Sequence, residues 1–309
     1  MSKDARPFVL ADLVYGASLR ETRMMISVPS MTTQPTHCLG IRAAGGILDR
    51  IVEAKAVRLE AAKRRTTLQE LIERAAERSS TRIRHSLTDA LARADSVNII
   101  AEIKQRSPSK GIIRDEFDPV SIAEAYAGAG AAALSVLAEE DFFGGSLDHL
   151  EAIRSRVALP LLRKDFIIDE YQLYESVLAG ADAVLLIVAM LEDELLESLI
   201  KLAGRLELDA LVEVHSTDEM KRAIRAGAAI IGVNNRDLTT FAVDLETSID
   251  LARLAPKGAV LVSESGIHSG SDIRRLKSAG FNAYLVGEHL MRAPDPGAAL
   301  GQLIREAVA

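Results

Sequence analysis

Short runs of apolar residues alternate with amphipathic stretches along most of the chain. The first run spans 97–103, and further runs follow at 132–137, 160–163, 183–188, 209–214, 229–233, 259–263 and 282–286. Short, almost wholly apolar runs are typical of strands that are buried on both faces of a sheet, and the stretches between them suit helices. Because parallel neighbours require crossover connections, the pattern predicts eight parallel strands that alternate with helices.

A short repeat precedes every second strand. Ala-Gly-Ala stands at 129–131, 179–181 and 226–228, and Ala-Gly-Phe stands at 279–281. These copies are separated by 50, 47 and 53 residues, which corresponds to two strand–helix units each time. An open doubly wound sheet would not divide naturally into four equal quarters, so the repeat predicts an α/β fold of the closed (β/α)8, or TIM, barrel type. The glycines are expected in the left-handed turn that ends each preceding helix.

Helical periodicity begins before the first strand. Apolar residues recur every three or four positions at Ile47, Ile51, Ala54, Val57 and Ala61, with Lys and Arg between them. Two further helices are expected at 68–78 and 86–94. We therefore predict one catalytic domain, residues 46–309, in which extra helices precede the barrel.

Residues 1–45 differ from the rest of the chain. They contain three prolines, show no sustained period and end in Gly45-Gly46. We expect an N-terminal extension that is poorly ordered. Two alternatives stay open: translation that begins at Met31, and an organelle-targeting role, which Asp4, Asp12 and Glu21 count against.

Composition narrows the class of protein. A net charge of −7 and the absence of Trp argue against a nucleic-acid partner, which would need clustered Lys and Arg and stacking rings. The single cysteine, Cys38, excludes an internal disulfide framework and a Cys-rich zinc site. No apolar run is long enough to span a membrane, and the first residues lack the layout of a secretory signal. A cytoplasmic enzyme is expected.

Charged residues stand at the ends of several predicted strands, where barrel enzymes collect their functional groups. Glu102 and Lys104 lie two residues apart, so both side chains point to the same face of the first strand. Lys164 follows the run 160–163. The alternatives are an exposed ion pair for the first two residues and a solvated strand end for Lys164.

Glu213 is enclosed by apolar neighbours within the run 209–214. Burial there predicts a raised pKa unless a cation lies near, which suits a general acid or base. The alternative is an inward Glu paired with a structural Lys, and His215 is expected only to begin a helix. Asn234 and Arg236, after the next strand, can supply neutral donors and a carboxylate clamp, or simply form a turn.

Gly266 and Gly287 directly follow the last two strands. Barrels commonly bind a phosphate group at this pair of loops, through backbone N–H groups beside helix N-termini. Either glycine alone could serve only to form a turn, but the two together favour a phosphorylated small-molecule substrate.

The ordered set of motifs resembles the indole-3-glycerol-phosphate synthase family, from about Ile47 to the end. The first-strand motif is Glu102-Ile-Lys104-Gln-Arg-Ser107-Pro-Ser-Lys-Gly. The later motifs are Ser135-Val-Leu, Phe142-Phe143-Gly-Gly, Leu162-Arg-Lys164-Asp-Phe166-Ile, Leu211-Val-Glu213-Val, Gly232-Val-Asn-Asn-Arg236-Asp-Leu and Glu264-Ser265-Gly266-Ile. Many matches in the right order make chance similarity improbable.

The resemblance implies a reaction of tryptophan biosynthesis without metal or organic cofactor. Ring closure, decarboxylation and dehydration convert 1-(2-carboxyphenylamino)-1-deoxyribulose 5-phosphate into indole-3-glycerol phosphate, CO2 and water. The resemblance makes Lys164 the general acid and Glu213 the base, with Lys104 on the anionic groups and Glu102 orienting it. The implied binding residues are Ser107, Phe142, Phe166, Asn234, Arg236 and Ser265, and those implied for phosphate are Gly266, Gly287 and Glu288.

Some features leave other readings open. His289 stands where the family pattern suggests a smaller residue such as serine, although the backbone contact to phosphate should survive. Phosphoribosylanthranilate isomerase is a similar barrel, but it uses a cysteine after the first strand, where Lys104 stands here. A Schiff-base aldolase with Lys164 as nucleophile and a barrel that only binds a partner are further rivals. A monomer or weak homo-oligomer is expected.

Overall fold

In the computed structural model, which describes residues 40–309, eight parallel strands close into a barrel. The order around the barrel is β1-β10-β9-β8-β7-β6-β5-β4. The strands are β1 (Asn98–Ile103), β4 (Ala133–Leu137), β5 (Leu161–Lys164), β6 (Ala183–Ile187), β7 (Asp209–Val214), β8 (Ile230–Asn234), β9 (Val260–Glu264) and β10 (Ala283–Val286). Every predicted apolar run matches one of them to within one residue at each end, so the (β/α)8 prediction is confirmed.

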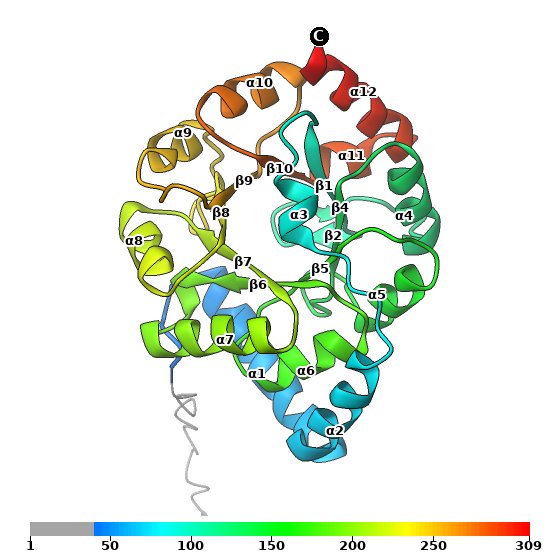
Figure 1. The fold of residues 1–309 in the computed structure, drawn as a ribbon, viewed down its shortest axis with the longest axis vertical. Coiled ribbons are helices and arrows are strands. Elements are labelled where there is room, and N and C mark those ends of the chain that lie inside the picture. Colours follow the sequence, from blue (N-terminus) through cyan, green and yellow to red (C-terminus); the bar gives the residue numbers. More distant parts are fainter. Residues whose placement is uncertain (1–39) are drawn as a thin grey trace, which may run out of the picture. The chain divides into compact units, whose positions relative to one another are not determined.

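Helices surround the barrel as an outer ring (Figure 1). They are α4 (Pro119–Gly128), α5 (Leu147–Arg154), α6 (Tyr171–Leu178), α7 (Asp193–Arg205), α8 (Thr217–Arg225), α9 (Glu246–Ala252), α10 (Gly270–Ser278) and α12 (Pro296–Val308). Smaller elements stand in the loops after the strands: β2 (Arg106–Ser107), β3 (Gly111–Ile112), the 3-10 turn η1 (Val188–Met190) and α11 (Glu288–Arg292). Within residues 40–309, no helix is both long and apolar enough to cross a membrane.

The repeated glycines end helices as predicted. Gly130, Gly180, Gly227 and Gly280 have φ angles of 95°, 80°, 83° and 105°. Side chains other than glycine seldom adopt this left-handed conformation, and it lets the chain turn from each helix into the next strand. The repeat in the sequence therefore marks the places where a helix must end in a residue with a positive φ angle.

Three helices precede the barrel: α1 (Ile47–Arg65), α2 (Leu68–Ser79) and α3 (Leu87–Leu91). The predicted apolar stripe of α1 is partly wrong, because Val57 is 70% exposed. The buried face instead consists of Leu48, Ile51, Val52, Lys55 and Leu59. Lys55 is buried because its Nζ lies 2.8 Å from Glu140 and 2.9 Å from Asp165, so a charged residue interrupts the sequence pattern of the inward face.

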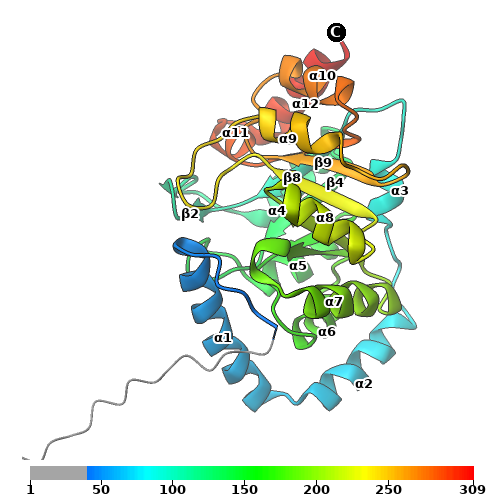
Figure 2. The same ribbon diagram turned by 90° about the vertical axis from the view of Figure 1, so that its left-hand side faces the viewer.

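The third helix is shorter than the predicted 86–94. It ends because the side-chain amide of Asn98 donates to the carbonyl oxygens of Leu91 (2.8 Å) and Arg93 (3.0 Å). Figure 2 shows α3 on one side of the barrel and α1 with β2 on the other. Since β2 follows the end of β1, α1 lies at the carboxyl ends of the strands and α3 at their amino ends.

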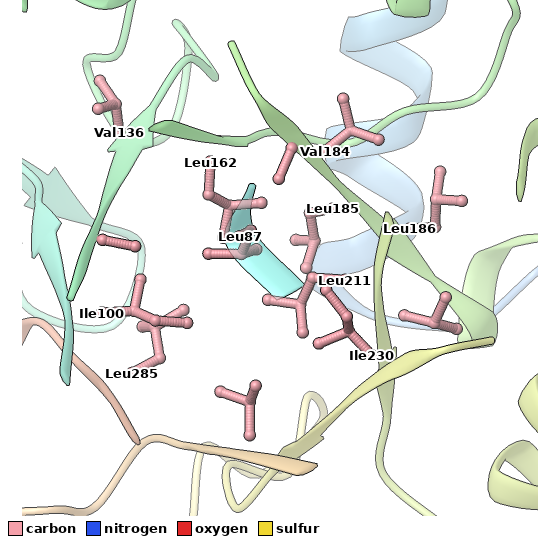
Figure 3. Packing of buried hydrophobic residues seen from close by; sticks show 14 of the residues in the cluster. Leu87, Ile100, Val136, Leu162, Val184, Leu185, Leu186, Leu211, Ile230 and Leu285 are labelled. Carbon is pink, nitrogen blue, oxygen red and sulfur yellow. The ribbon is translucent and has the colours of Figure 1, made fainter. Parts of the chain in front are cut away.

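Apolar side chains fill the barrel interior. Figure 3 shows Leu87 of α3 among inward-pointing residues of the strands: Ile100, Leu162, Leu185, Leu211, Ile230 and Leu285. Side chains two positions further along a strand point to the same face. The next interior layer, toward the carboxyl ends, therefore contains Glu102, Lys164 and Glu213.

Part of the predicted extension 1–45 lies among the described residues. Ile41 forms a backbone bridge with Leu191, and the Arg42 N–H donates to the carbonyl of Met190 at 3.0 Å. Residues 1–39, with Cys38 and the alternative start at Met31, lie outside the described part of the chain.

Candidate active site

A cavity of about 410 Å³ opens above the charged layer at the carboxyl ends of the strands. This volume lies within the usual range for small-molecule sites. The cavity brings together almost all the residues expected from the sequence: Glu102, Lys104, Ser107, Lys164, Phe166, Glu213, Asn234, Arg236, Ser265, Gly266, Gly287 and Glu288. Helix α1 contributes Ile47, Leu48 and Ile51 to its wall.

The expectation for Phe142 is not met, because this residue is absent from the cavity lining and Phe143 occupies it. The Glu139 carboxylate accepts the N–H groups of Phe142 (2.8 Å) and Phe143 (3.0 Å), which fixes a tight turn. Consecutive side chains in such a turn diverge. The Phe142 ring lies 5.8 Å from the guanidinium carbon of Arg50, whereas the Phe143 ring lies 6.0 Å from that of Phe166. An apolar wall of two rings results.

Lys164 occupies the centre of the charged layer. Its Nζ lies 2.8 Å from Oε2 of Glu213 and 3.1 Å from Oε2 of Glu264. Burial alone would lower the pKa of Lys164, but Glu213, Glu264 and Glu102 outweigh it and raise the pKa. The ammonium group is therefore held in its protonated form.

The two carboxylates beside Lys164 have opposite pKa shifts. Burial raises the pKa of Glu213, but Lys164 and His215 outweigh it, so the net shift is downward. The sequence predicted a raised pKa for Glu213 unless a cation lies near, and Lys164 is such a cation. Burial raises the pKa of Glu264 to about 7, with a further contribution from Glu213, while Lys164 acts in the opposite direction. Two unlike carboxyl groups flank one lysine.

Glu102 and Lys104 form a partly enclosed ion pair at the mouth of β1, with side chains 6% and 15% exposed. The alternative of a solvated pair is thereby excluded. A Cβ atom at Gly287 would overlap Oε1 of Glu102, so the carboxylate occupies space that only glycine leaves open. This is a second reason, besides turn formation, for glycine after β10.

Asn234 joins Glu213 to the loop after β9. Its Nδ2 donates to Oε1 of Glu213 at 3.1 Å, and its Oδ1 accepts from Oγ of Ser265 at 2.9 Å. Ser265 has a φ angle of 69°, a costly conformation for a residue with a side chain. The contacts leave Asn234 oriented toward Glu213 and not in an exposed turn.

The residues expected to bind phosphate line the same cavity, in the loops after β9 and β10. Gly266, Gly287 and Glu288 line it, and Gly287 immediately precedes α11. The Glu288 carboxylate pairs with Arg292 (3.1 Å) and Arg236 (3.6 Å), so the Arg236 side chain lies on this side. The rings of His268 and His289 are 5.8 Å apart beside the same loops.

Two residues of the site escaped the sequence interpretation. Glu264 ends β9 after the apolar residues Val260, Leu261 and Val262, but a serine stands on each side of it, so it lacks the apolar neighbours that singled out Glu213 on β7. His215 does precede helix α8 as expected, and it also lies 3.3 Å from Glu213. Within residues 40–309, no group of three or more His, Cys, Asp or Glu side chains is arranged to hold a metal ion.

The fold and the cavity define a (β/α)8 barrel with buried lysine and glutamate side chains at the carboxyl ends of its strands, where barrel enzymes have their active sites. The chain belongs to the indole-3-glycerol phosphate synthase family, whose model matches residues 48–303. It is thus a carboxy-lyase of tryptophan biosynthesis with a phosphorylated small-molecule substrate.

Curated relatives agree over most of the chain. An indole-3-glycerol phosphate synthase of Carboxydothermus hydrogenoformans is 49% identical over 261 residues, which cover 83% of this chain and 99% of the relative. That of Albidiferax ferrireducens is 46% identical, with coverage of 84% and 99%.

Solved structures of other barrels share the fold at low identity. A 3-hexulose-6-phosphate synthase from Salmonella typhimurium has a TM-score of 0.56 at 15% identity, and covers 69% of this chain and 99% of its own. A thiamine phosphate pyrophosphorylase from Pyrococcus furiosus has a TM-score of 0.54 at 17% identity, with coverage of 72% and 98%. These similarities concern the fold alone.

Proposed function

We propose that Lys164 and Glu213 transfer the protons by which 1-(2-carboxyphenylamino)-1-deoxyribulose 5-phosphate becomes indole-3-glycerol phosphate, CO2 and water. The observation that carries the proposal is the position of the Lys164 ammonium group, 2.8 Å from Glu213 inside the cavity. A donor and an acceptor in direct contact can serve successive steps of one reaction.

Ring closure requires a proton on the substrate ketone. As the aromatic carbon that bears the carboxylate attacks the carbonyl carbon, negative charge develops on the carbonyl oxygen. Lys164 donates a proton to this oxygen and gives a hydroxyl group. The carboxylate then leaves as CO2, which restores the aromatic ring. The carboxylates that raise the pKa of Lys164 keep it protonated before the step.

Dehydration requires both an acid and a base. The hydroxyl group leaves as water with a second proton from a lysine ammonium group, while Glu213 removes a proton from the adjacent carbon to complete the indole. The low pKa of Glu213 keeps it ionised, and Asn234 fixes the direction of one carboxylate oxygen. Lys104, oriented by Glu102, holds the anionic groups of the substrate.

The rest of the cavity binds the two ends of the substrate. Phe143 and Phe166 supply an apolar surface for the aromatic ring, and Ser107 lines the same cavity. Gly266, Gly287 and Glu288 take the phosphate, mainly through backbone N–H groups, and Ser265 adds a hydroxyl. Asn234 and Arg236 bind the anthranilate part of the substrate. To do so, the Arg236 side chain must first leave its ion pair with Glu288.

The test is incubation of the purified chain with the carboxyphenylamino-deoxyribulose phosphate while indole fluorescence is followed. Rapid formation of indole-3-glycerol phosphate is expected, and no conversion of phosphoribosylanthranilate in a parallel assay. Borohydride trapping separates the aldolase alternative, since a synthase should form no covalent adduct on Lys164. Absence of indole, or a trapped adduct, would contradict the proposal. The cytoplasmic location and the monomeric or weakly oligomeric state stay predictions.

A further inference from the structure

A buried cation on α1 reaches the chain segments that carry the aromatic wall of the cavity. Lys55 lies one helical turn after Ile51, which lines the cavity. The Lys55 Nζ atom lies 2.9 Å from Oδ1 of Asp165 and 2.8 Å from Oε2 of Glu140. The side chains of Lys55 and Asp165 are 6% and 0% exposed, so water and salt screen their attraction little. Lys55 does not line the cavity itself, and the proposed proton transfers do not use it.

Each carboxylate beside Lys55 lies close in the chain to one ring of the aromatic wall. Asp165 directly precedes Phe166, and its Oδ1 atom also accepts the Phe166 N–H at 2.8 Å. Glu140 lies three residues before Phe143, in the loop between β4 and α5. One ammonium group therefore joins the two segments whose rings, Phe143 and Phe166, lie 6.0 Å apart.

We propose that Lys55 is a positioning residue, which holds the Phe143 and Phe166 rings at the separation that fits the aromatic part of the substrate. It acts through Glu140 and Asp165 and does not touch the substrate. The inference rests on the proposed function, in which these two rings bind the aromatic part of the substrate.

The surrounding charges allow Lys55 to be replaced without loss of the fold. Oδ2 of Asp165 accepts from the Arg163 guanidinium at 2.7 and 3.1 Å, so Asp165 keeps a cation when Lys55 is absent. The Glu140 side chain is 37% exposed and can turn to water. Loss of a buried ion pair is most costly where it leaves a buried charge without a partner, and neither carboxylate would be in that position. Lys55→Met, which keeps most of the side-chain length, should therefore fold.

A role in stability alone is the competing explanation. The loop between β4 and α5 has other attachments, because Arg58 pairs with Asp141 at 2.6 Å and the Arg106 guanidinium donates to the Asp141 carbonyl oxygen at 2.6 Å. If these contacts suffice to place Phe143, Lys55 only attaches α1 to the barrel. Replacement of Lys55 would then lower the free energy of unfolding without any coupling to the Phe143 ring.

The decisive experiment is a double-mutant cycle on KM with Lys55→Met and Phe143→Ala. Lys55→Met should raise KM about fivefold, less than complete removal of a buried ring, and should change KM more than kcat. Because Lys55 acts through the position of the Phe143 ring, its replacement should matter less once that ring is gone. The KM of the double variant should thus lie at least about threefold below the product of the two single effects.

Lys63→Met is the matched control. Lys63 lies on the same helix and pairs at 2.7 Å with Asp169, also in the segment between β5 and α6, but its side chain is 33% exposed and does not line the cavity. Its KM should stay within about twofold of wild type, as for most substitutions near a surface.

Glu140→Gln decides the matter if Lys55→Met fails to fold, since it weakens only the link between Lys55 and the loop. It should raise KM less than Lys55→Met and show coupling of the same sign to Phe143→Ala. An unchanged KM in Lys55→Met, an equal rise in Lys63→Met, or effects of Lys55→Met and Phe143→Ala that multiply fully would overturn the inference. A wild-type chain that forms no indole would instead overturn the proposed function itself.

Discussion

The Nζ atom of Lys164 and the Oε2 atom of Glu213 lie 2.8 Å apart, although Lys164 is the last residue of β5, Glu213 is the last but one of β7, and β6 lies between these strands in the barrel. Both side chains reach the barrel axis because each stands two residues beyond a leucine of the interior layer, Leu162 or Leu211 (Figure 3). The alternation of the strands thus creates the acid–base pair. Nothing in the loops is needed to bring these two groups together.

Glu264, the second carboxyl group beside Lys164, should make stability depend on pH. Its pKa is about 7 in the folded chain against an ordinary value of 4.5. A raised pKa means that the folded state binds this proton more tightly. The stabilisation is complete below pH 4.5 and is lost as the pH rises through 7. The free energy of unfolding of Glu264→Gln, relative to that of wild type, should therefore be higher at pH 8 than at pH 5.

The measurement is urea unfolding of wild type and Glu264→Gln at the two pH values. The shift of Glu213 is downward and acts below pH 4.5, so it does not contribute in this window. An equal difference in the free energy of unfolding at pH 5 and pH 8 would refute the upward shift of Glu264.

The two adjacent phenylalanines offer a matched pair of variants. Phe143→Ala should raise KM about tenfold or more, because a buried aromatic ring contributes roughly 1.5–3 kcal/mol. Phe142→Ala should change KM less than Phe143→Ala, since its ring lies toward Arg50 and does not line the cavity. Steady-state kinetics of both variants decide the point, and a larger effect at Phe142 would reverse the assignment.

Gly287 should tolerate no side chain. In Gly287→Ala the new Cβ would displace the Glu102 carboxylate, and with it the partner of Lys104. A misplacement of about 1 Å can cost on the order of 10²-fold in rate, so kcat/KM should fall by that order.

His289→Ser is the neighbouring control. Burial and His268 lower the pKa of His289, which leaves it uncharged near neutral pH and of little use to a phosphate dianion. Turnover should stay within about twofold of wild type, as for most substitutions near a surface. A loss comparable to that of Gly287→Ala would show that the imidazole itself binds substrate.

Much of the fold could be predicted because its signals are local. The apolar runs place every strand of the described barrel to within a residue or two at each end, and the spaced glycines reflect a left-handed turn at each copy. The buried face of α1 could not be derived in the same way. Lys55 belongs to that face only because Glu140 and Asp165, about 85 and 110 residues further on, neutralise it.

In the site, too, local signals could be read from the sequence, whereas contacts between separate elements could not. Glu102, Lys164 and Glu213 could be recognised because a charged residue interrupts an apolar strand. Phe142 was misplaced because the direction of a side chain in a turn depends on Glu139, whose three backbone contacts no periodicity reveals. His215 contacts Glu213, which lies two residues before it in the chain. The same ring also contacts Glu219 of the following helix, and the pattern of the strand does not reveal this second contact.

The central claim, that Lys164 acts before decarboxylation and Glu213 after it, is tested most directly with substrate labelled in the carboxyl group. Glu213→Gln should lower indole formation by about 10²–10⁴-fold, with an unfolding transition close to that of wild type. In a single turnover it should still release labelled CO2, while indole fluorescence fails to appear. Lys164→Ala should bind substrate and yield neither product. Release of CO2 and formation of indole slowed to the same extent in Glu213→Gln would contradict the account.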